Sequence, residues 1–198
     1  MRLGLKLCVM ALATLFGEAA MIAGNIEGVI RARDVADSPE LVVSVEDVSG
    51  TFQPPSAHAV VDQRGLRFIP HVLVILAGTT VDFTNSDPLL HNVFSISEAK
   101  RFNLGLYGRG TVRSIRFDQP GVVELLCNVH QEMSGYIVVL KNPFFAVATN
   151  GKKYRIENVP PGERRVRCWH PQLGENEVIV HVPENGNVTA DCELRPSQ

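Results

Sequence analysis

Residues that commonly bind metals gather near the middle of this 198-residue chain. Cys127, His130 and Met133 fall within seven consecutive residues, and His91 lies upstream, just after a predicted strand. A thiolate and imidazoles in a trigonal site, with a weak axial thioether, are the ligands of a blue-copper centre. Because loops at one end of an antiparallel sandwich can meet, His91 can join the other three residues. The pattern therefore predicts one mononuclear type 1 copper ion bound by these four side chains.

The same residues are also compatible with roles that involve no copper. A lone buried cysteine is usually a small apolar side chain, and a lone methionine usually fills space in a core. Zinc would favour more Cys or His ligands and no Met. A c-type haem needs a second cysteine, but only Asn128 and Val129 separate Cys127 from His130. A nucleophilic Cys–His pair would need a third group, and none accompanies it in the sequence.

The N-terminus has the pattern of a secretory signal peptide, which we expect to span residues 1–19. Arg2 and Lys6 precede the apolar run Leu7–Phe16, and small residues lie before a cleavage point after Ala19. The alternative is a membrane anchor, but this run is too short to cross a bilayer. We therefore expect a periplasmic protein with no membrane span after cleavage, in a compartment that oxidises thiols.

Composition and hydrophobic pattern predict an all-β protein. Apolar residues make up 45% of the chain and charged residues 20%, which excludes a disordered chain, a collagen and a coiled coil. Short alternating segments such as Thr79–Asn85 and Thr111–Phe117 are separated by Gly and Pro turns, and no long segment keeps a helical period. Many short strands with frequent turns are typical of sandwiches and barrels. We expect a long loop over Glu98–Gly110, where three glycines interrupt the pattern.

The stretch from about Phe68 to Val139 resembles the cupredoxins, a family of copper proteins with a Greek-key β-sandwich fold. Three motifs carry the resemblance: Phe68-x-Pro70-x-x-Leu73-x-Ile75-x-x-Gly78-x-x-Val81-x-Phe83-x-Asn85, Asp87-Pro88-Leu89-Leu90-His91-Asn92-Val93-Phe94, and Gly121-x-x-x-Leu125-x-Cys127-x-x-His130-x-x-Met133-x-Gly135. The His-x-x-Met spacing is similar to the short ligand loop of the amicyanins, whereas plastocyanins have a longer loop.

The resemblance implies a role for each residue of the pattern. The two histidines and Cys127 would be equatorial copper ligands, Met133 would be the axial ligand, and Asn92 would brace the cysteine loop by a hydrogen bond. One departure is that the family commonly has proline directly before the second histidine, where this chain has Val129. By this resemblance the protein carries single electrons and is not an enzyme. A c-type cytochrome or a periplasmic dehydrogenase would be its redox partner.

Some functions are excluded or left as alternatives. A formal net charge of −2 gives no reason to expect a nucleic-acid partner. No Gly-rich nucleotide motif is present, so we expect no nucleotide cofactor. We also expect no catalytic residue. The main alternative is a copper-binding or copper-sensing module that transfers no electrons. A copper oxidase is weaker, because multicopper sites need several His-x-His pairs and the six histidines form none.

The C-terminal part resembles a carboxypeptidase regulatory-like, or transthyretin-like, β-sandwich. The segments that carry this resemblance are residues 149–162 and 166–171. Such a module usually opens with a strand pair, which residues 142–198 lack and residues 25–52 can supply. We therefore expect a second small β-sandwich made of these two stretches, with the cupredoxin domain, residues 53–141, inserted into it. In the alternative layout, residues 25–48 extend the cupredoxin and leave a C-terminal appendage, which would bury little core alone.

Two further cysteines lie in the C-terminal part. Cys168 and Cys192 each fall on the inward face of a predicted strand by period-two alternation. Two inward cysteines can form a bridge when their strands are neighbours and the compartment is oxidising. We therefore expect a disulfide between them, and the alternative is a pair of buried free thiols.

Overall fold

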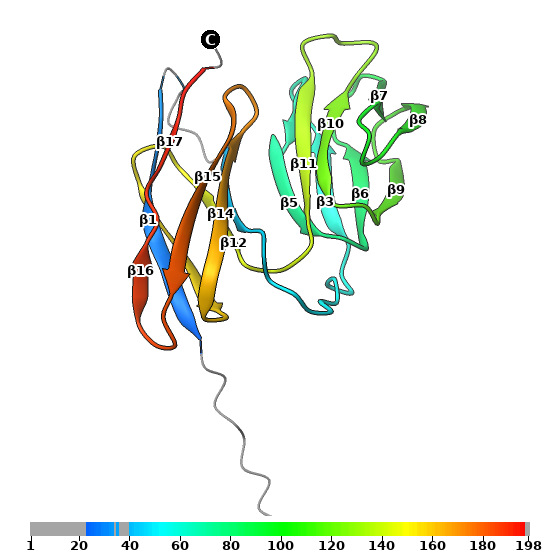
Figure 1. The fold of residues 1–198 in the computed structure, drawn as a ribbon. Coiled ribbons are helices and arrows are strands. Elements are labelled where there is room, and N and C mark those ends of the chain that lie inside the picture. Colours follow the sequence, from blue (N-terminus) through cyan, green and yellow to red (C-terminus); the bar gives the residue numbers. More distant parts are fainter. Residues whose placement is uncertain (1–22, 34, 36–39, 197–198) are drawn as a thin grey trace, which may run out of the picture.

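The computed structural model describes residues 23–33, 35 and 40–196. This part of the chain forms seventeen strands and no helix, which confirms the all-β prediction. Figure 1 shows the strands gathered into two bodies that lie side by side. The expected signal peptide, residues 1–19, lies outside the described residues. Within the described residues, no helix has the length and hydropathy that a membrane span requires.

The first body, here called the outer sandwich, is built from both ends of the chain (Figure 1). In one sheet β1 (Gly24–Ala32) pairs with β13 (Lys153–Val159) and with the short strands β16 (Asn187–Thr189) and β17 (Cys192–Leu194). The other sheet has the order β12 (Phe145–Ala148), β2 (Leu41–Val45), β14 (Gly162–His170) and β15 (Gly174–Val182). Alternate residues such as Ile26, Ile30, Val166 and Val180 are buried in one shared core.

The second body, here called the inner sandwich, uses the middle of the chain. One sheet has the order β4 (Phe68–Ile69), β3 (Ala59–Gln63), β6 (Thr79–Asn85) and β9 (Val112–Phe117). The other has the order β5 (Val72–Leu76), β11 (Ser134–Leu140), β10 (Gly121–Leu126), β7 (His91–Ser95) and β8 (Phe102–Tyr107). Strand β6 has the predicted bounds, and its alternate residues Thr79, Val81, Phe83 and Asn85 are buried. The period of two read from the sequence therefore selects the core face of this strand.

Strand pairing bears on how the chain is divided. In the described part of the chain, β1 pairs with β13, β16 and β17, β2 pairs with β12 and β14, and neither pairs with β3 to β11. The Val45 N–H donates to the Phe144 carbonyl at 2.9 Å, so the two connections between the sandwiches lie side by side. This pairing supports a discontinuous outer domain, and we propose the boundaries expected from the sequence, residues 25–52 with 142–198 around residues 53–141.

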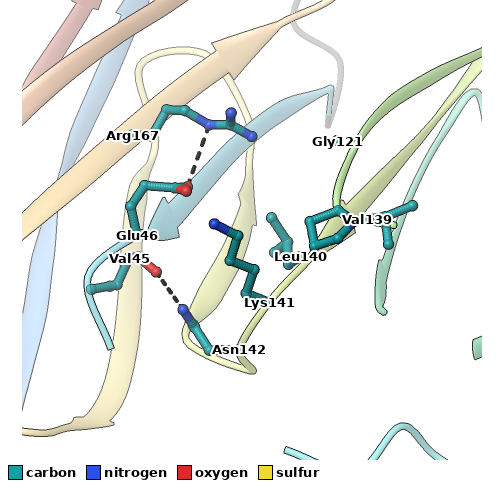
Figure 2. Close-up of a pocket in the computed structure, with 9 residues that line it drawn as sticks. Val45, Glu46, Gly121, Val139, Leu140, Lys141, Asn142 and Arg167 are labelled. Carbon is teal, nitrogen blue, oxygen red and sulfur yellow. Dashed lines mark hydrogen bonds and ion pairs between the residues drawn. The ribbon is translucent and has the colours of Figure 1, made fainter. Parts of the chain in front are cut away.

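A third apolar cluster joins the two sandwiches. Its buried members are Val42, Val72, Val138, Leu140 and Trp169. At one end of this interface, Figure 2 shows a pocket where the amide of Asn142 donates to the Val45 carbonyl at 2.7 Å. In the same pocket the Arg167 guanidinium lies 3.4 Å from the Glu46 carboxylate. The sandwiches are therefore held by apolar contact along the interface, and the two polar contacts at this end join residues within the outer sandwich.

Two expectations from the sequence are wrong. The stretch 98–110 is not a loop throughout, because it contains β8, which pairs antiparallel with β7. Gly105 and Asn103 interrupt the apolar residues of this strand, which is ordered by its pairing with β7. The expected disulfide is also absent: Cys168 and Cys192 are buried free thiols on opposite sheets of the outer sandwich. A hydrogen bond with Cys192, together with burial, raises the pKa of the Cys168 thiol.

Candidate metal centre

The sheet of β7 and β10 brings the predicted ligands to one end of the inner sandwich. His91 is the first residue of β7, and Cys127 follows directly after β10. The two strands are antiparallel neighbours, so the start of one lies at the end of the other. His130 and Met133 lie in the loop from β10 to β11, at the top of the inner sandwich in Figure 1.

Three of these side chains form a compact cluster. The ligand atoms of His91, Cys127 and His130 all lie within 4.8 Å of one another. The Nδ1 atoms of the two histidines are 3.0 Å apart. His91 is fully buried, Cys127 is 4% exposed and His130 is partly exposed. Met133 is 1% exposed and belongs to the same core cluster as Cys127. The structure thus gathers a thiol and two imidazoles, with a thioether buried in the same core.

A carboxylate fixes the orientation of the first histidine. The Nε2 atom of His91 lies 2.9 Å from a carboxylate oxygen of Asp87, which is also buried. A carboxylate only accepts hydrogen bonds, so Nε2 carries the proton of the neutral ring. The lone pair of the ring is then on Nδ1, which faces His130. This arrangement prepares His91 to bind a metal through Nδ1.

Asp87 is held in its ionised form by donors on several sides. Burial acts to raise the pKa of Asp87, but hydrogen bonds from the backbone N–H groups of Gly65 and Leu66 and from His91 outweigh burial and lower it. The donor–acceptor distances are 2.7 Å from Gly65 and 3.1 Å from Leu66. The negative charge that orients His91 is therefore stabilised by the turn between β3 and β4.

Two asparagines hold the loops that carry the cluster. The Asn92 side-chain oxygen accepts the Asn128 N–H at 2.8 Å, which is the brace implied by the family resemblance. The Asn85 amide donates to the carbonyls of Leu89 and Tyr107 at 2.9 and 3.0 Å. Because Asn128 follows Cys127 and Leu89 precedes His91, these bonds fix the chain next to both residues.

Apolar side chains are exposed beside the cluster. Val129 is 48% exposed and directly precedes His130. Leu89 and Leu90, which directly precede His91, are 47% and 58% exposed. We call these three residues the apolar rim. The partly exposed ring of His130 is therefore the part of the cluster that a partner can reach.

Asp87 and Tyr107 are residues of the site that sequence reasoning missed. A signal for Asp87 was its place four residues before His91. Tyr107 lies opposite His91 in the β7–β8 pair and is 4% exposed. Burial raises the pKa of Tyr107 to about 12, although the Gln63 amide donates to its hydroxyl oxygen at 2.6 Å. No sequence signal places Tyr107 at the site, because its position depends on β8.

Comparisons with known proteins give matches among solved structures. No family model and no curated protein matches the sequence. A copper-containing nitrite reductase from Thermus scotoductus is 28% identical over 46% of this chain and 26% of that chain, with a TM-score of 0.42. A purple cupredoxin from Nitrosopumilus maritimus is 29% identical over 41% of this chain and 98% of that chain, with a TM-score of 0.38. A reduced amicyanin variant is 21% identical over 49% of this chain and 97% of that chain, with a TM-score of 0.40.

Proposed function

We propose that His91, Cys127, His130 and Met133 bind one copper ion in a type 1 centre, and that the protein is a periplasmic single-electron carrier. The observation that carries this proposal is the compact cluster of one thiol and two imidazoles. The cupredoxin motifs of the sequence supply the axial methionine and the spacing of the loop. The matches to solved copper proteins cover only part of this chain, so the proposal rests on the residues of the site.

The donor set fits copper better than the common competitors. Two imidazoles, one thiolate and a weak thioether are soft or intermediate ligands that suit both Cu(I) and Cu(II). A structural zinc site takes four Cys or His ligands, and this cluster offers three. The Nδ1 lone pair of His91 already faces His130, so one nitrogen ligand atom is oriented towards the cluster.

The residues of the site would support electron transfer in distinct ways. Bound copper would accept and release one electron by alternating between Cu(II) and Cu(I). Asp87 keeps His91 in one tautomer and one orientation. Asn92 fixes the backbone after Cys127, and the burial of Cys127 keeps water from the thiolate. Rigid positions favour transfer, because one ligand geometry must serve both oxidation states.

The apolar rim surrounds the place where the electron would leave the protein. A redox partner such as a c-type cytochrome or a periplasmic dehydrogenase would dock on Val129, Leu89 and Leu90. A small apolar contact suits electron-transfer complexes, which bury little area and separate quickly. The electron would then pass through the partly exposed ring of His130.

The absorption spectrum of the copper-loaded protein tests the proposed centre. We expect an intense thiolate-to-Cu(II) band near the red end of the visible spectrum, and we expect Cys127→Ser to abolish it. A colourless protein that binds Zn(II) in preference to copper would overturn the assignment.

A copper-binding or copper-sensing module without electron transfer is the second candidate. The observation that favours it is the outer sandwich, which adds a second β-body and an apolar interface to the inner one. The electron self-exchange rate of the loaded protein separates the two functions. We expect fast exchange for a carrier, whereas slow exchange in a blue protein would favour the module.

A further inference from the structure

Strand β11 leads directly away from Met133, and an aromatic contact from the outer sandwich reaches its first residues. The ring of Tyr136 packs edge to face against His71 and against Trp169, with ring centres 5.6 Å apart in both pairs. Trp169 comes from β14 of the outer sandwich and is 7% exposed. Tyr136, only three residues after Met133, is thus packed between residues of the two sandwiches.

A polar contact from the outer sandwich reaches the same place. Glu40, just before β2, accepts a hydrogen bond from His71 Nδ1 at 2.9 Å. The other carboxylate oxygen of Glu40 lies 3.8 Å from Nε2 of His170, whose Nδ1 accepts the Gln172 N–H. One carboxylate of the outer sandwich therefore contacts a histidine of each sandwich.

His71 also contacts the backbone that follows Met133. Its carbonyl accepts the Tyr136 N–H at 2.7 Å. A Cβ atom at Gly135 would lie 3.2 Å from the same carbonyl and 3.0 Å from Cβ of Phe68, so the chain is in close contact here. A shift of His71 must therefore move the backbone that follows Met133.

The other end of β11 offers a natural comparison. Val139 and Leu140 line the pocket of Figure 2 together with Glu46, Lys141 and Arg167. Glu46 is also a carboxylate of the outer sandwich at the interface, and it pairs with Arg167 at 3.4 Å. It lines the pocket at the end of β11 that is remote from Met133.

We propose that Glu40 and Trp169 are positioning residues through which the outer sandwich sets the place of Met133, and with it the reduction potential of the centre. This inference rests on the proposed copper function. The thioether of Met133 would be a weak and distant ligand, so the protein chain would determine its place more than the metal would. Glu40 acts through His71, and Trp169 acts through Tyr136.

Two pairs of variants test this inference. Trp169→Leu removes the aromatic contact without changing charge, and Trp169→Phe retains a ring. Glu40→Ala removes the acceptor of His71, and Glu40→Gln keeps an acceptor oxygen while removing the charge. We expect Trp169→Leu and Glu40→Ala to change the equilibrium constant for reduction by a fixed mediator by about 2- to 30-fold. We expect Trp169→Phe, Glu40→Gln and the control Glu46→Ala to remain close to the wild type.

A measurement without metal separates this inference from the copper assignment. In the metal-free protein, we expect the methyl NMR signal of Met133 to shift in Trp169→Leu and Glu40→Ala and not in Glu46→Ala. Blue variants with the wild-type potential and an unshifted methyl signal would overturn the positioning role and leave the copper centre intact. A colourless wild type with a shifted methyl signal would overturn the copper function, while the contact to Met133 would stand. Melting curves of the metal-free variants identify any that fail to fold. If Trp169→Leu fails to fold, Glu40→Ala decides, and if Glu40→Ala fails to fold, Trp169→Leu decides.

Discussion

Asp87→Asn replaces the carboxylate that orients His91 with a side chain of the same size. In the structure one carboxylate oxygen accepts the Gly65 N–H at 2.7 Å. The other oxygen accepts the Leu66 N–H at 3.1 Å and the His91 Nε2–H at 2.9 Å. An amide has only one oxygen, so its NH₂ group must face one of these donors. The substitution therefore cannot satisfy all three donors as the structure arranges them.

Both orientations of the new amide weaken the metal site. If its NH₂ group faces His91, the imidazole keeps a hydrogen bond only by moving its proton to Nδ1, which removes the lone pair that faces His130. If the NH₂ group faces Gly65, two N–H groups oppose each other in a partly buried place. Loss of an outer partner of a metal-binding histidine typically lowers metal affinity by about 10- to 100-fold. We expect a loss of this size for copper.

Competition titration of the metal-free protein against a copper chelator measures this affinity. The matched control is Asp82→Asn, because Asp82 also lies 2.9 Å from a ring nitrogen of a histidine, in this case Nδ1 of His58. That pair is on the outer face of β6, with the Asp82 side chain 25% exposed, away from the cluster. An affinity of Asp87→Asn within about 2-fold of the wild type would refute the tautomer argument.

Three further predictions concern the scaffold of the site. Asn92→Ala leaves the Asn128 N–H without its acceptor, and we expect a loss of about 1–3 kcal/mol in the free energy of unfolding of the metal-free protein, measured with urea; no loss would mean that water replaces the bond. The Ser114 hydroxyl, and then His58, lower the pKa of Asp82 against the effect of burial. The stability that Asp82 contributes is therefore present above about pH 4 and is lost as pH falls through its folded-state pKa. We expect the free energies of unfolding of the wild type and Asp82→Asn, measured with urea, to differ at neutral pH and to converge in acid. A difference that stays constant with pH would contradict this. Phe83→Ala removes a fully buried ring, and we expect a loss of about 3–5 kcal/mol by chemical denaturation; a loss well below this range would mean that the inner core collapses around the cavity.

The sequence allowed prediction of features that depend on local patterns. The period of two in Thr79–Asn85 gave the bounds and buried face of β6, because alternation is a property of the strand itself. The spacing of Cys127 and His130 placed both in one loop, and the structure brings His91 to them. Their role as copper ligands stays a prediction.

Features that depend on partners distant in the sequence could not be predicted. Strand β8 has weak alternation and exists through its pairing with β7, so Tyr107 could not be placed at the site. The contact of Glu40 with His71 joins two sandwiches, and no pattern within either segment indicates it. The inward faces of Cys168 and Cys192 were expected correctly, but alternation does not decide whether two thiols form a bond.

Strands β2 and β12 form an antiparallel pair in which Ser44 lies opposite Phe145. In the outer sandwich they are therefore the two arms of a β-hairpin whose turn has been replaced by the whole inner sandwich. Closing a flexible loop costs about 0.6 kcal/mol more for each doubling of its length. A folded insert whose ends already lie side by side removes most of that cost, since its own core fixes the distance between its ends. The outer sandwich should then tolerate replacement of the insert by a short turn, and the hairpin would be restored as a local contact.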